Sequence, residues 1–154
     1  MNHVQHILEI ARQRGQEQEL PFEGIVTTQE AWDLLQQDSN VKLIDVRTNA
    51  ERDWVGKVTV AAEQHGAVEW VAYPGGVQNA DFMTQLKAQA RPDQVLLFLC
   101  RSGVRSRAAA KLATEHGFKQ CYDILHGFEG DKNDHGHRKT VGGWCHSSLP
   151  WVGA

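Results

Sequence analysis

The sequence predicts one α/β domain built on a mostly parallel sheet, and three observations lead to this expectation. Apolar runs at residues 42–46 and 95–99 are short and continuous, which is typical of parallel strands buried on both faces. A third strand-like run occupies residues 120–124. Segments with helical spacing lie between these runs, and strands that alternate with helical stretches are characteristic of α/β domains.

The chain is expected to open with a helix outside the domain proper. Apolar residues recur there at helical spacing and predict about three turns of amphipathic helix: Val4, Ile7, Leu8 and Ala11. Residues 15–19 are polar and without pattern, as in a tether. We therefore divide the chain into an N-terminal helix and tether at residues 1–20 and a domain at residues 21–154. We expect the helix to pack on the fold rather than to act as a partner-binding arm.

Each later element has its own local signal. The capping box of residues 27–30, Thr-Thr-Gln-Glu, predicts the start of a helix that carries Ala31, Trp32, Leu34 and Leu35. Asn79 is expected to cap a helix that places Phe82, Met83 and Leu86 on one face. Alanines and leucines four residues apart predict a helix from Val104, and Gly117 stands where such a helix ends.

Composition excludes several classes of protein. The chain has 154 residues, 41% hydrophobic and 23% charged, which fits one globular domain. Its 16 basic and 19 acidic residues give a net charge of −3, so no nucleic-acid partner is expected. No apolar run approaches the roughly 20 residues of a membrane span, and acidic residues interrupt the N-terminal segment, so neither membrane association nor a signal peptide is expected. Three cysteines are too few for a disulfide framework, and we expect a reducing cytoplasm.

The most informative segment is residues 100–106, Cys-Arg-Ser-Gly-Val-Arg-Ser. It lies between the run at 95–99 and the helix from Val104, at the carboxyl end of a predicted strand, where parallel sheets bind ligands. Unpaired N–H groups and the helix dipole favour an anion at that point, and the thiolate of Cys100 is one such anion. Residues 100–111 also contain four basic residues and no acidic one, which indicates a site for a small anion. Cys121 and Cys145 lack such surroundings and are interpreted as inert packing residues.

These motifs resemble those of the rhodanese family of sulfurtransferases. Residues 100–106 resemble the active-site loop in which the cysteine takes up a sulfane sulfur, and residues 43–47, Leu-Ile-Asp-Val-Arg, followed by Glu51 and Gly56, resemble the upstream signature. The resemblance covers about residues 24–151. It implies one rhodanese-like domain with a five-stranded parallel sheet and helices on both faces, the N-terminal helix being extra. Two segments depart from the family pattern: Lys57-Val58 replaces His-Ile, and His126-Gly127-Phe128 stands near the usual Gly-Gly pair.

The resemblance and the charge pattern assign roles to individual residues. Cys100 is the expected catalytic nucleophile. The expected substrate-binding residues are those whose amides cradle the outer sulfur, with the two arginines orienting the donor: Arg101, Ser102, Gly103, Val104 and Arg105. Asp45, Arg47 and Glu51 are expected to form an ion-paired network that braces the loop beside the site, and a catalytic role for them is the less favoured alternative. Trp70 and Tyr73 are candidates to line the pocket, but aromatic residues in such a stretch are more often packing residues, and that interpretation is favoured.

No cofactor and no metal are expected. His135, His137, Cys145 and His146 lie near one another in sequence, but they lack the paired spacing of a structural zinc site. The expected partners are a small anionic sulfur donor such as thiosulfate and an acceptor that is cyanide, a thiol or a protein cysteine.

Two other functions stay open at this stage. Cysteine-based phosphatases and arsenate reductases also place an arginine after the cysteine, but with five residues between them, whereas Cys100 and Arg105 are separated by four. The shorter ring suits one sulfur atom better than a tetrahedral oxyanion. The second alternative is a persulfide carrier or regulatory module that docks on a protein partner through the N-terminal helix.

Overall fold

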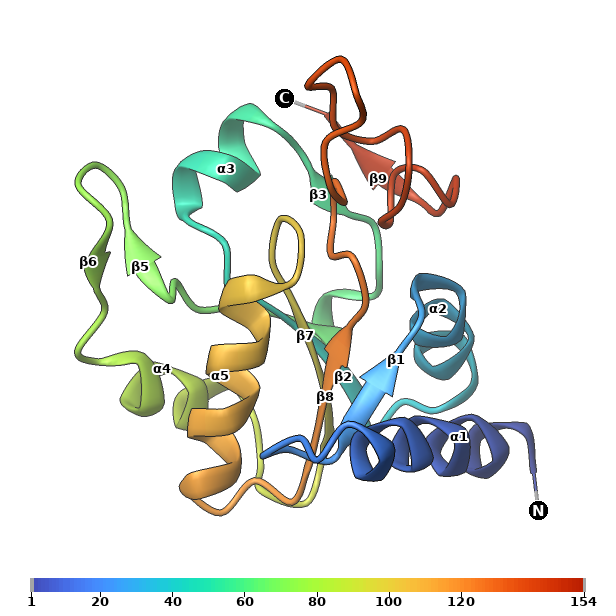
Figure 1. Cartoon of the computed structure of the whole chain (residues 1–154). Helices are drawn as coiled ribbons and strands as arrows, with labels where there is room; N and C mark the ends of the chain where they lie inside the picture. The colour runs from blue at the N-terminus through green and yellow to red at the C-terminus, as the bar shows by residue number, and fades with distance from the viewer. Residues whose placement is uncertain (1, 154) are drawn as a thin grey trace.

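The computed structural model describes residues 2–153, and its centre is a five-stranded sheet in which every strand pair is parallel (Figure 1). The strand order is β1-β8-β7-β2-β4. The strands are β1 (Gly24–Val26), β2 (Val41–Asp45), β4 (His65–Ala67), β7 (Val95–Leu99) and β8 (Gln120–Ile124). The predicted α/β class is thus confirmed, and the two apolar runs and the strand-like run at 120–124 form the three central strands.

Helices cover both faces of the sheet, as expected (Figure 1). One face carries α1 (His3–Glu17) and α2 (Thr28–Gln37), and the other carries α4 (Phe82–Gln89) and α5 (Val104–Glu115). The remaining elements are small: α3 (Asn49–Trp54), the 3-10 turn η1 (Ala62–Gln64), the pair β3 (Lys57–Val58) with β9 (Trp151–Val152), and the hairpin of β5 (Val71–Ala72) and β6 (Val77–Gln78).

Successive residues of the central strands supply two separate cores. Leu97 and Leu99 of β7 pack toward α1 and α2, whereas Leu96 and Phe98 pack toward α4 and α5. Side chains alternate between the two faces of a strand, so a strand covered on both faces needs apolar residues at every position. This explains why the run at 95–99 is continuous rather than alternating.

The N-terminal helix packs on the fold, as predicted. Its apolar residues Ile7, Leu8 and Ala11 are buried against β1 and α2. The helix crosses β1 so closely that a Cβ on Gly24 would lie 2.1 Å from the carbonyl oxygen of Ala11, which only glycine avoids. The division of the chain at residue 20 stays a prediction.

The two helix starts predicted from capping signals have different outcomes. Thr27 and Glu30 form the predicted capping box at α2. The prediction for Asn79 is wrong, because α4 begins at Phe82 after Asp81 and has no side-chain cap. The Asn79 side chain instead accepts a hydrogen bond from the Asp81 N–H at 3.0 Å and donates one to the Glu69 carbonyl at 2.8 Å, so it closes the turn before the helix.

The segment after β8 returns across the carboxyl end of the sheet before ending in β9 (Figure 1). Trp144 is fully buried there, and its indole N–H donates to the Pro150 carbonyl at 2.8 Å. The pairing of β9 with β3 fastens this segment beside the loop that follows α3. Between residues 2 and 153, no helix has the length and apolar character needed to cross a membrane.

Candidate active site

Cys100 follows directly after β7, the middle strand of the sheet, and precedes α5. Its side chain is only 1% exposed. The Gly103 N–H donates a hydrogen bond to Sγ at 3.0 Å, and Sγ lies 3.3 Å from the hydroxyl oxygen of Ser106. The sulfur therefore sits against the first turn of a 12-residue helix whose N-terminus has no side-chain cap. Both the N–H donor and the positive end of the helix dipole stabilise negative charge at this atom.

The loop of residues 100–103 is held from outside through its carbonyl oxygens. The Cys100 carbonyl accepts from the Phe128 N–H at 2.8 Å, and the Arg101 carbonyl accepts from the N–H groups of Glu129 and Gly130 at 2.9 and 3.1 Å. Gly103 has a φ of +122°, in the region that favours glycine, and this turn brings its N–H toward the sulfur. The segment after β8 thus fixes the loop while one of the loop amides faces Cys100.

The departure from the family pattern at residues 126–128 has a structural explanation. His126 and Gly127 both have positive φ, 67° and 64°. A Cβ on Gly127 would lie 2.4 Å from the Cys100 carbonyl oxygen, whereas His126 adopts the left-handed conformation with a full side chain. Glycine is therefore required at the second position of the pair, where the backbone approaches the loop, and not at the first.

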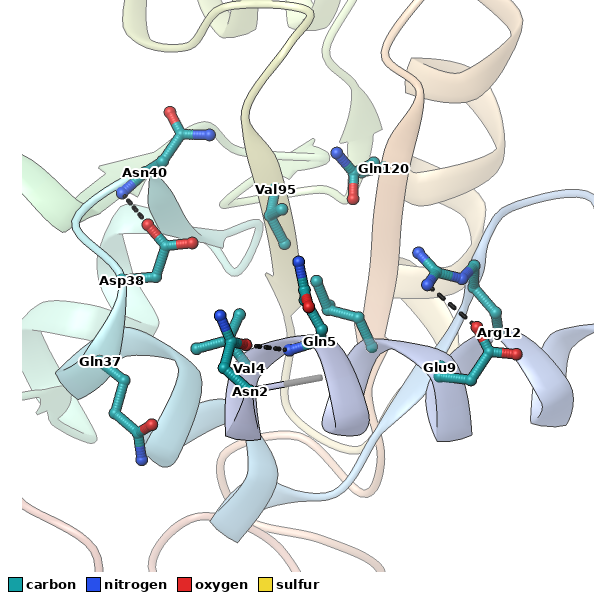
Figure 2. A pocket seen from close by; sticks show the side chains of 11 residues that line it. Asn2, Val4, Gln5, Glu9, Arg12, Gln37, Asp38, Asn40, Val95 and Gln120 are labelled. Atoms are coloured by element: carbon teal, nitrogen blue, oxygen red, sulfur yellow. Dashed lines mark hydrogen bonds and ion pairs between the residues drawn. The ribbon is translucent and has the colours of Figure 1, made fainter.

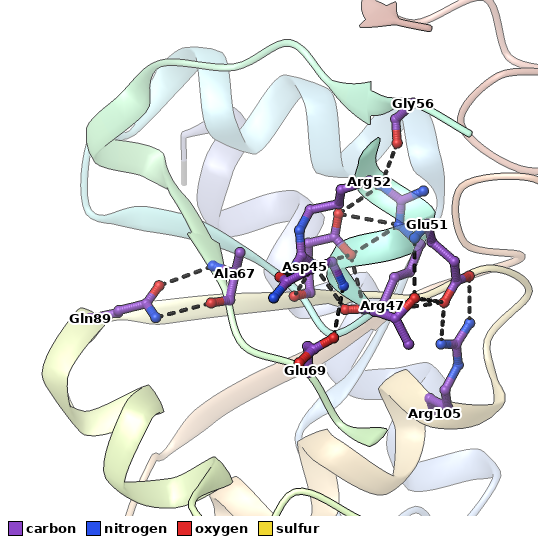
Figure 3. Close-up of polar contacts among 11 residues, drawn as sticks. Asp45, Arg47, Glu51, Arg52, Gly56, Ala67, Glu69, Gln89 and Arg105 are labelled. Atoms are coloured by element: carbon purple, nitrogen blue, oxygen red, sulfur yellow. Dashed lines mark hydrogen bonds and ion pairs between the residues drawn. The ribbon is translucent and has the colours of Figure 1, made fainter. Parts of the chain in front are cut away.

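Glu51 reaches the loop through Arg105 (Figure 3). The Arg105 guanidinium donates to both Glu51 carboxylate oxygens, at 2.6 and 2.9 Å, and the same carboxylate accepts from the N–H and the hydroxyl of Thr48 at 3.1 Å. Burial opposes ionisation of Glu51, but the hydrogen bonds from Arg105 and Thr48 outweigh it and lower the pKa of this carboxyl to about 2. The hydrogen bonds to Glu51 likewise raise the pKa of Arg105, against the effect of burial.

Asp45 and Arg47 form a second, fully buried ion pair (Figure 3). Arg47 donates to the Asp45 carboxylate at 2.8 Å and to the Gly56 carbonyl at 2.8 Å, and its guanidinium lies 4.2 Å from the centre of the Phe128 ring. Phe128 is the residue that binds the Cys100 carbonyl. The three residues expected to form one network therefore lie in two ion-paired groups. Asp45 binds Arg47 and also Arg52, at 3.5 Å, beneath the segment that fixes the loop. Glu51 binds Arg105 and so joins α3 to α5.

Sequence reasoning missed the roles of Ser106, which contacts Cys100, and of Asp123, which binds Ser106. The Ser106 hydroxyl lies 2.5 Å from the Asp123 carboxylate, and Arg107 binds the same carboxylate at 3.2 Å. Burial raises the pKa of Asp123 to about 6, although the contacts with Ser106 and Arg107 act in the opposite direction. An aspartate inside the strand-like run at 120–124 was the available signal, since an acidic residue in a buried strand needs a partner.

Pockets lie at both ends of the sheet. One of about 450 Å³ adjoins the Cys100 loop, and its lining residues are Ser102, Gly103, Val104, Arg107, Asp123, Leu125 and His126. A larger one, of about 660 Å³, lies against α1 (Figure 2). Val95 and Gln120, the first residues of β7 and β8, line the larger pocket, so it is at the opposite end of the strands from Cys100.

The remaining predicted residues lie around the site or away from it. Arg101 on the loop and Val104, the first residue of α5, are exposed. Trp70 packs edge-on against Phe82, as expected of a packing residue, whereas Tyr73 is 58% exposed and packs against Trp54 at the surface.

The other two thiols differ from Cys100 in their surroundings. Burial raises the pKa of Cys121 to about 12 and that of Cys145 to about 11, so both are protonated near neutral pH. Over the described part of the chain, no three His, Cys, Asp or Glu side chains gather in a group suited to a metal ion.

The chain is similar to known proteins both in sequence and in structure. Residues 23–154 match the family described as the STR4 middle domain. The crystal structure of Rv0390 from M. tuberculosis superposes with a TM-score of 0.76 at 36% identity, over 83% of this chain and 96% of that one. The uncharacterized protein RC0915 of Rickettsia conorii is 33% identical over 128 residues, 82% of this chain and 94% of that protein. The thiosulfate sulfurtransferase GlpE of Haemophilus influenzae is 28% identical over 131 residues, 85% of this chain and 95% of that protein.

Proposed function

The chain belongs to the rhodanese-like family that includes the STR4 middle domain, and from that premise we propose that it is a sulfurtransferase that carries a sulfane sulfur on Cys100. The observation that supports this most is the position of the Cys100 sulfur, 3.0 Å from the Gly103 N–H at the start of α5. A thiolate in this position is stabilised by a backbone donor and a helix dipole, and a thiolate is the form of cysteine that attacks sulfur.

The first half-reaction is attack on an anionic donor such as thiosulfate. The Cys100 thiolate forms a bond to the outer sulfur of thiosulfate while the bond between the two thiosulfate sulfurs breaks. Sulfite leaves with the bonding electrons, and a persulfide anion stays on Cys100. The thiolate and thiosulfate together carry the same charge as the persulfide anion and sulfite together, so charge is conserved in this step. No outside oxidant or reductant is needed.

The loop residues have separate tasks in this proposal. The amides of residues 101–105 stabilise the outer persulfide sulfur as preorganised donors. Arg101, exposed on the loop, attracts the sulfonate group of the donor. Arg105 acts from a fixed position, because Glu51 holds two of its nitrogens and leaves its other N–H groups for the donor.

The second half-reaction removes the sulfur. A nucleophile, either cyanide, a small thiol or a cysteine of a partner protein, attacks the outer sulfur and Cys100 leaves as the thiolate. Because the two half-reactions share one covalent intermediate, the kinetics are ping-pong. We expect this chemistry to take place in the cytoplasm, where thiols stay reduced.

The experiment that tests the proposal is the intact mass of the reduced protein after incubation with thiosulfate. We expect a gain of one sulfur atom that cyanide removes, and no gain in Cys100→Ser. Cys121→Ser is the matched control, because that buried thiol has a raised pKa and lies off the loop; it should gain sulfur as the wild type does. A wild type that gains no sulfur from thiosulfate, or a Cys100→Ser variant that does, would contradict the proposal.

A further inference from the structure

Cys100, Ser106 and Asp123 form a continuous buried chain of polar atoms. The sulfur lies 3.3 Å from the Ser106 hydroxyl oxygen, and that oxygen lies 2.5 Å from the Asp123 carboxylate. The three side chains are at most 1% exposed. They come from three consecutive elements, the end of β7, the first turn of α5 and β8, so the fold itself brings them together.

The register of the sheet explains how Asp123 comes within reach of Cys100. Asp123 lies opposite Phe98, two residues before the cysteine, on the neighbouring parallel strand. Phe98 and Cys121 both belong to the core beneath α5, and alternation along β8 puts Asp123 on that same face. Ser106, on the buried side of α5, fills the space between the carboxylate and the sulfur.

The surroundings of Asp123 suit a group that gains and loses a proton near neutral pH. Burial raises the pKa of Asp123 to about 6, against the effects of Ser106 and Arg107. The charged and titratable groups that face it are Arg107 of α5 at 3.2 Å, His126 in the pocket they share, and Cys100 through Ser106. A general base works best when it titrates near the working pH, which makes this carboxylate better suited than one at its usual value.

We propose that Ser106 and Asp123 form a proton relay for Cys100, an inference that rests on the proposed sulfur transfer. In the first half-reaction the S–H bond of Cys100 breaks and its proton passes to the Ser106 oxygen. The hydroxyl proton of Ser106 passes at the same time to the Asp123 carboxylate. Cys100 becomes the attacking thiolate and Asp123 a neutral acid, so the net charge of the three groups does not change.

The second half-reaction runs the relay in reverse. When Cys100 leaves the persulfide as a thiolate, Asp123 gives its proton to Ser106, and Ser106 gives its own proton to the sulfur. The single hydroxyl proton of Ser106 couples the two ends, since it points at the carboxylate when Asp123 is ionised and at the sulfur when Asp123 is protonated. Ser106, which touches the reacting sulfur, is catalytic in this scheme, and Asp123 acts through it.

The test is the rate of persulfide formation from thiosulfate in single turnovers, measured by rapid quench and intact mass over about pH 4.5 to 9. In the wild type we expect the rate to rise with pH and to inflect near 6, where Asp123 loses its proton. Asp123→Asn and Ser106→Ala should each lose this inflection and fall about 100-fold at neutral pH. The double variant should be no slower than either single variant, because each change breaks the same chain.

Two control variants each remove a hydroxyl or a carboxylate that lies outside the relay. Thr114→Val deletes another hydroxyl of α5, one that binds the Ala110 carbonyl, and Asp93→Asn deletes an exposed carboxylate. Both should keep the wild-type profile. The relay would be overturned if the rate losses of the two single variants multiplied in the double variant. It would also be overturned if the pH profile of Asp123→Asn kept the inflection near 6.

A surface variant keeps the inference testable if the buried ones do not fold. The Arg107 side chain is 39% exposed, and its charge lowers the pKa of Asp123. Arg107→Gln should therefore move the inflection of persulfide formation to higher pH while leaving the three relay groups in place. An inflection that stays where it is in the wild type would contradict the relay.

A second readout separates the relay from the sulfurtransferase proposal. Alkylation of Cys100 by iodoacetamide needs the thiolate but no sulfur donor. If thiosulfate gives no persulfide, and the alkylation rate still inflects near 6 only when Ser106 and Asp123 are both present, the relay holds and the proposed function fails. If persulfide forms normally in both single variants, the relay fails and the proposed function holds.

Discussion

Two capping boxes in this molecule are built almost identically, one far from Cys100 and one beside it. At α2, Thr27 and Glu30 cap the helix, and Arg14 donates to the glutamate at 2.6 and 3.0 Å. At α3, Thr48 and Glu51 do the same, and Arg105 donates at 2.6 and 2.9 Å. Both carboxylates are 20% exposed, so solvent screens the two ion pairs to a similar degree.

The two units differ in what their arginines join. Arg14 belongs to α1 and also donates to the Ile25 carbonyl, so it fastens the N-terminal helix to the edge of the sheet. Arg105 is the second residue of α5, in the turn that faces the Cys100 sulfur. The same local contacts thus stabilise both units, and we expect catalysis to depend only on the unit that fixes the cysteine loop.

The largest difference between the two units is expected in the rate of persulfide formation when the arginine of each unit is replaced by methionine. Arg105→Met removes the ion pair to Glu51 and a donor for the substrate, and misplacing a reacting loop costs on the order of 100-fold in rate. Arg14→Met removes an ion pair of the same geometry and should leave the rate unchanged. The measurement is single-turnover persulfide formation at neutral pH.

The free energy of unfolding of the two methionine variants is the control for the comparison of their rates. Each variant leaves one partly buried glutamate without its partner, which should lower the free energy of unfolding in urea by about 1–3 kcal/mol in both cases. Equal losses of rate in the two variants would show that rate follows general stability rather than position. An unchanged rate in Arg105→Met would remove Arg105 from the proposed site.

The second prediction concerns the pH dependence of stability. The folded-state pKa of Glu51 is about 2, below the value of about 4.3 for an unfolded chain. Its contribution is therefore fully present above about pH 4.3 and is lost as the pH falls toward 2, with a magnitude on the order of 3 kcal/mol. We expect Glu51→Gln to flatten the acid limb of the stability profile by this amount, measured by urea unfolding from neutral pH downward.

Two other carboxyls define the controls for that measurement. The pKa of Glu30 is also lowered, against burial, by Arg14 and Thr27, so Glu30→Gln should flatten the same limb without affecting persulfide formation. Asp123 has the opposite sign, because its raised pKa makes the fold lose stability as the pH rises from about 4 to 6. That contribution is common to wild type and Glu51→Gln and cancels in their difference. A parallel acid limb in the two proteins would contradict the role given to Glu51.

The two capping boxes also show what a sequence pattern can predict. The box at α2 is followed by buried residues at helical spacing, Ala31, Leu34 and Leu35, so the cap and the periodicity support each other. The helix α3 has six residues and buries none of them, so it has no periodicity to support its cap. The Thr-x-x-Glu pattern of the second box stands at residues 48–51, but without a following period it does not by itself predict a helix. Only the structure shows that its glutamate contacts Arg105, 54 residues away.

The same limit applies to the site. The position of Cys100 follows from the order of a strand, a small loop and a helix, because parallel strands end at the same edge of the sheet. Asp123 depends on the parallel register of β7 with β8, which the sequence does not specify. The separation of Asp45 and Arg47 from Glu51 likewise depends on how α3 turns away from β2. The sequence spacing favoured one network where the structure has two ion-paired groups.

The smallest effect is expected from the cap threonines themselves. Thr27→Ala and Thr48→Ala each remove one hydroxyl that accepts from a backbone N–H at 3.1 Å, which should cost about 1 kcal/mol of unfolding free energy. In Thr48→Ala the Glu51 carboxylate keeps both bonds to Arg105, so persulfide formation should fall by no more than about 3-fold. Thr27→Ala should leave that rate unchanged. A loss in Thr48→Ala as large as in Arg105→Met would mean that the cap of α3, and not the ion pair, holds the cysteine loop in place.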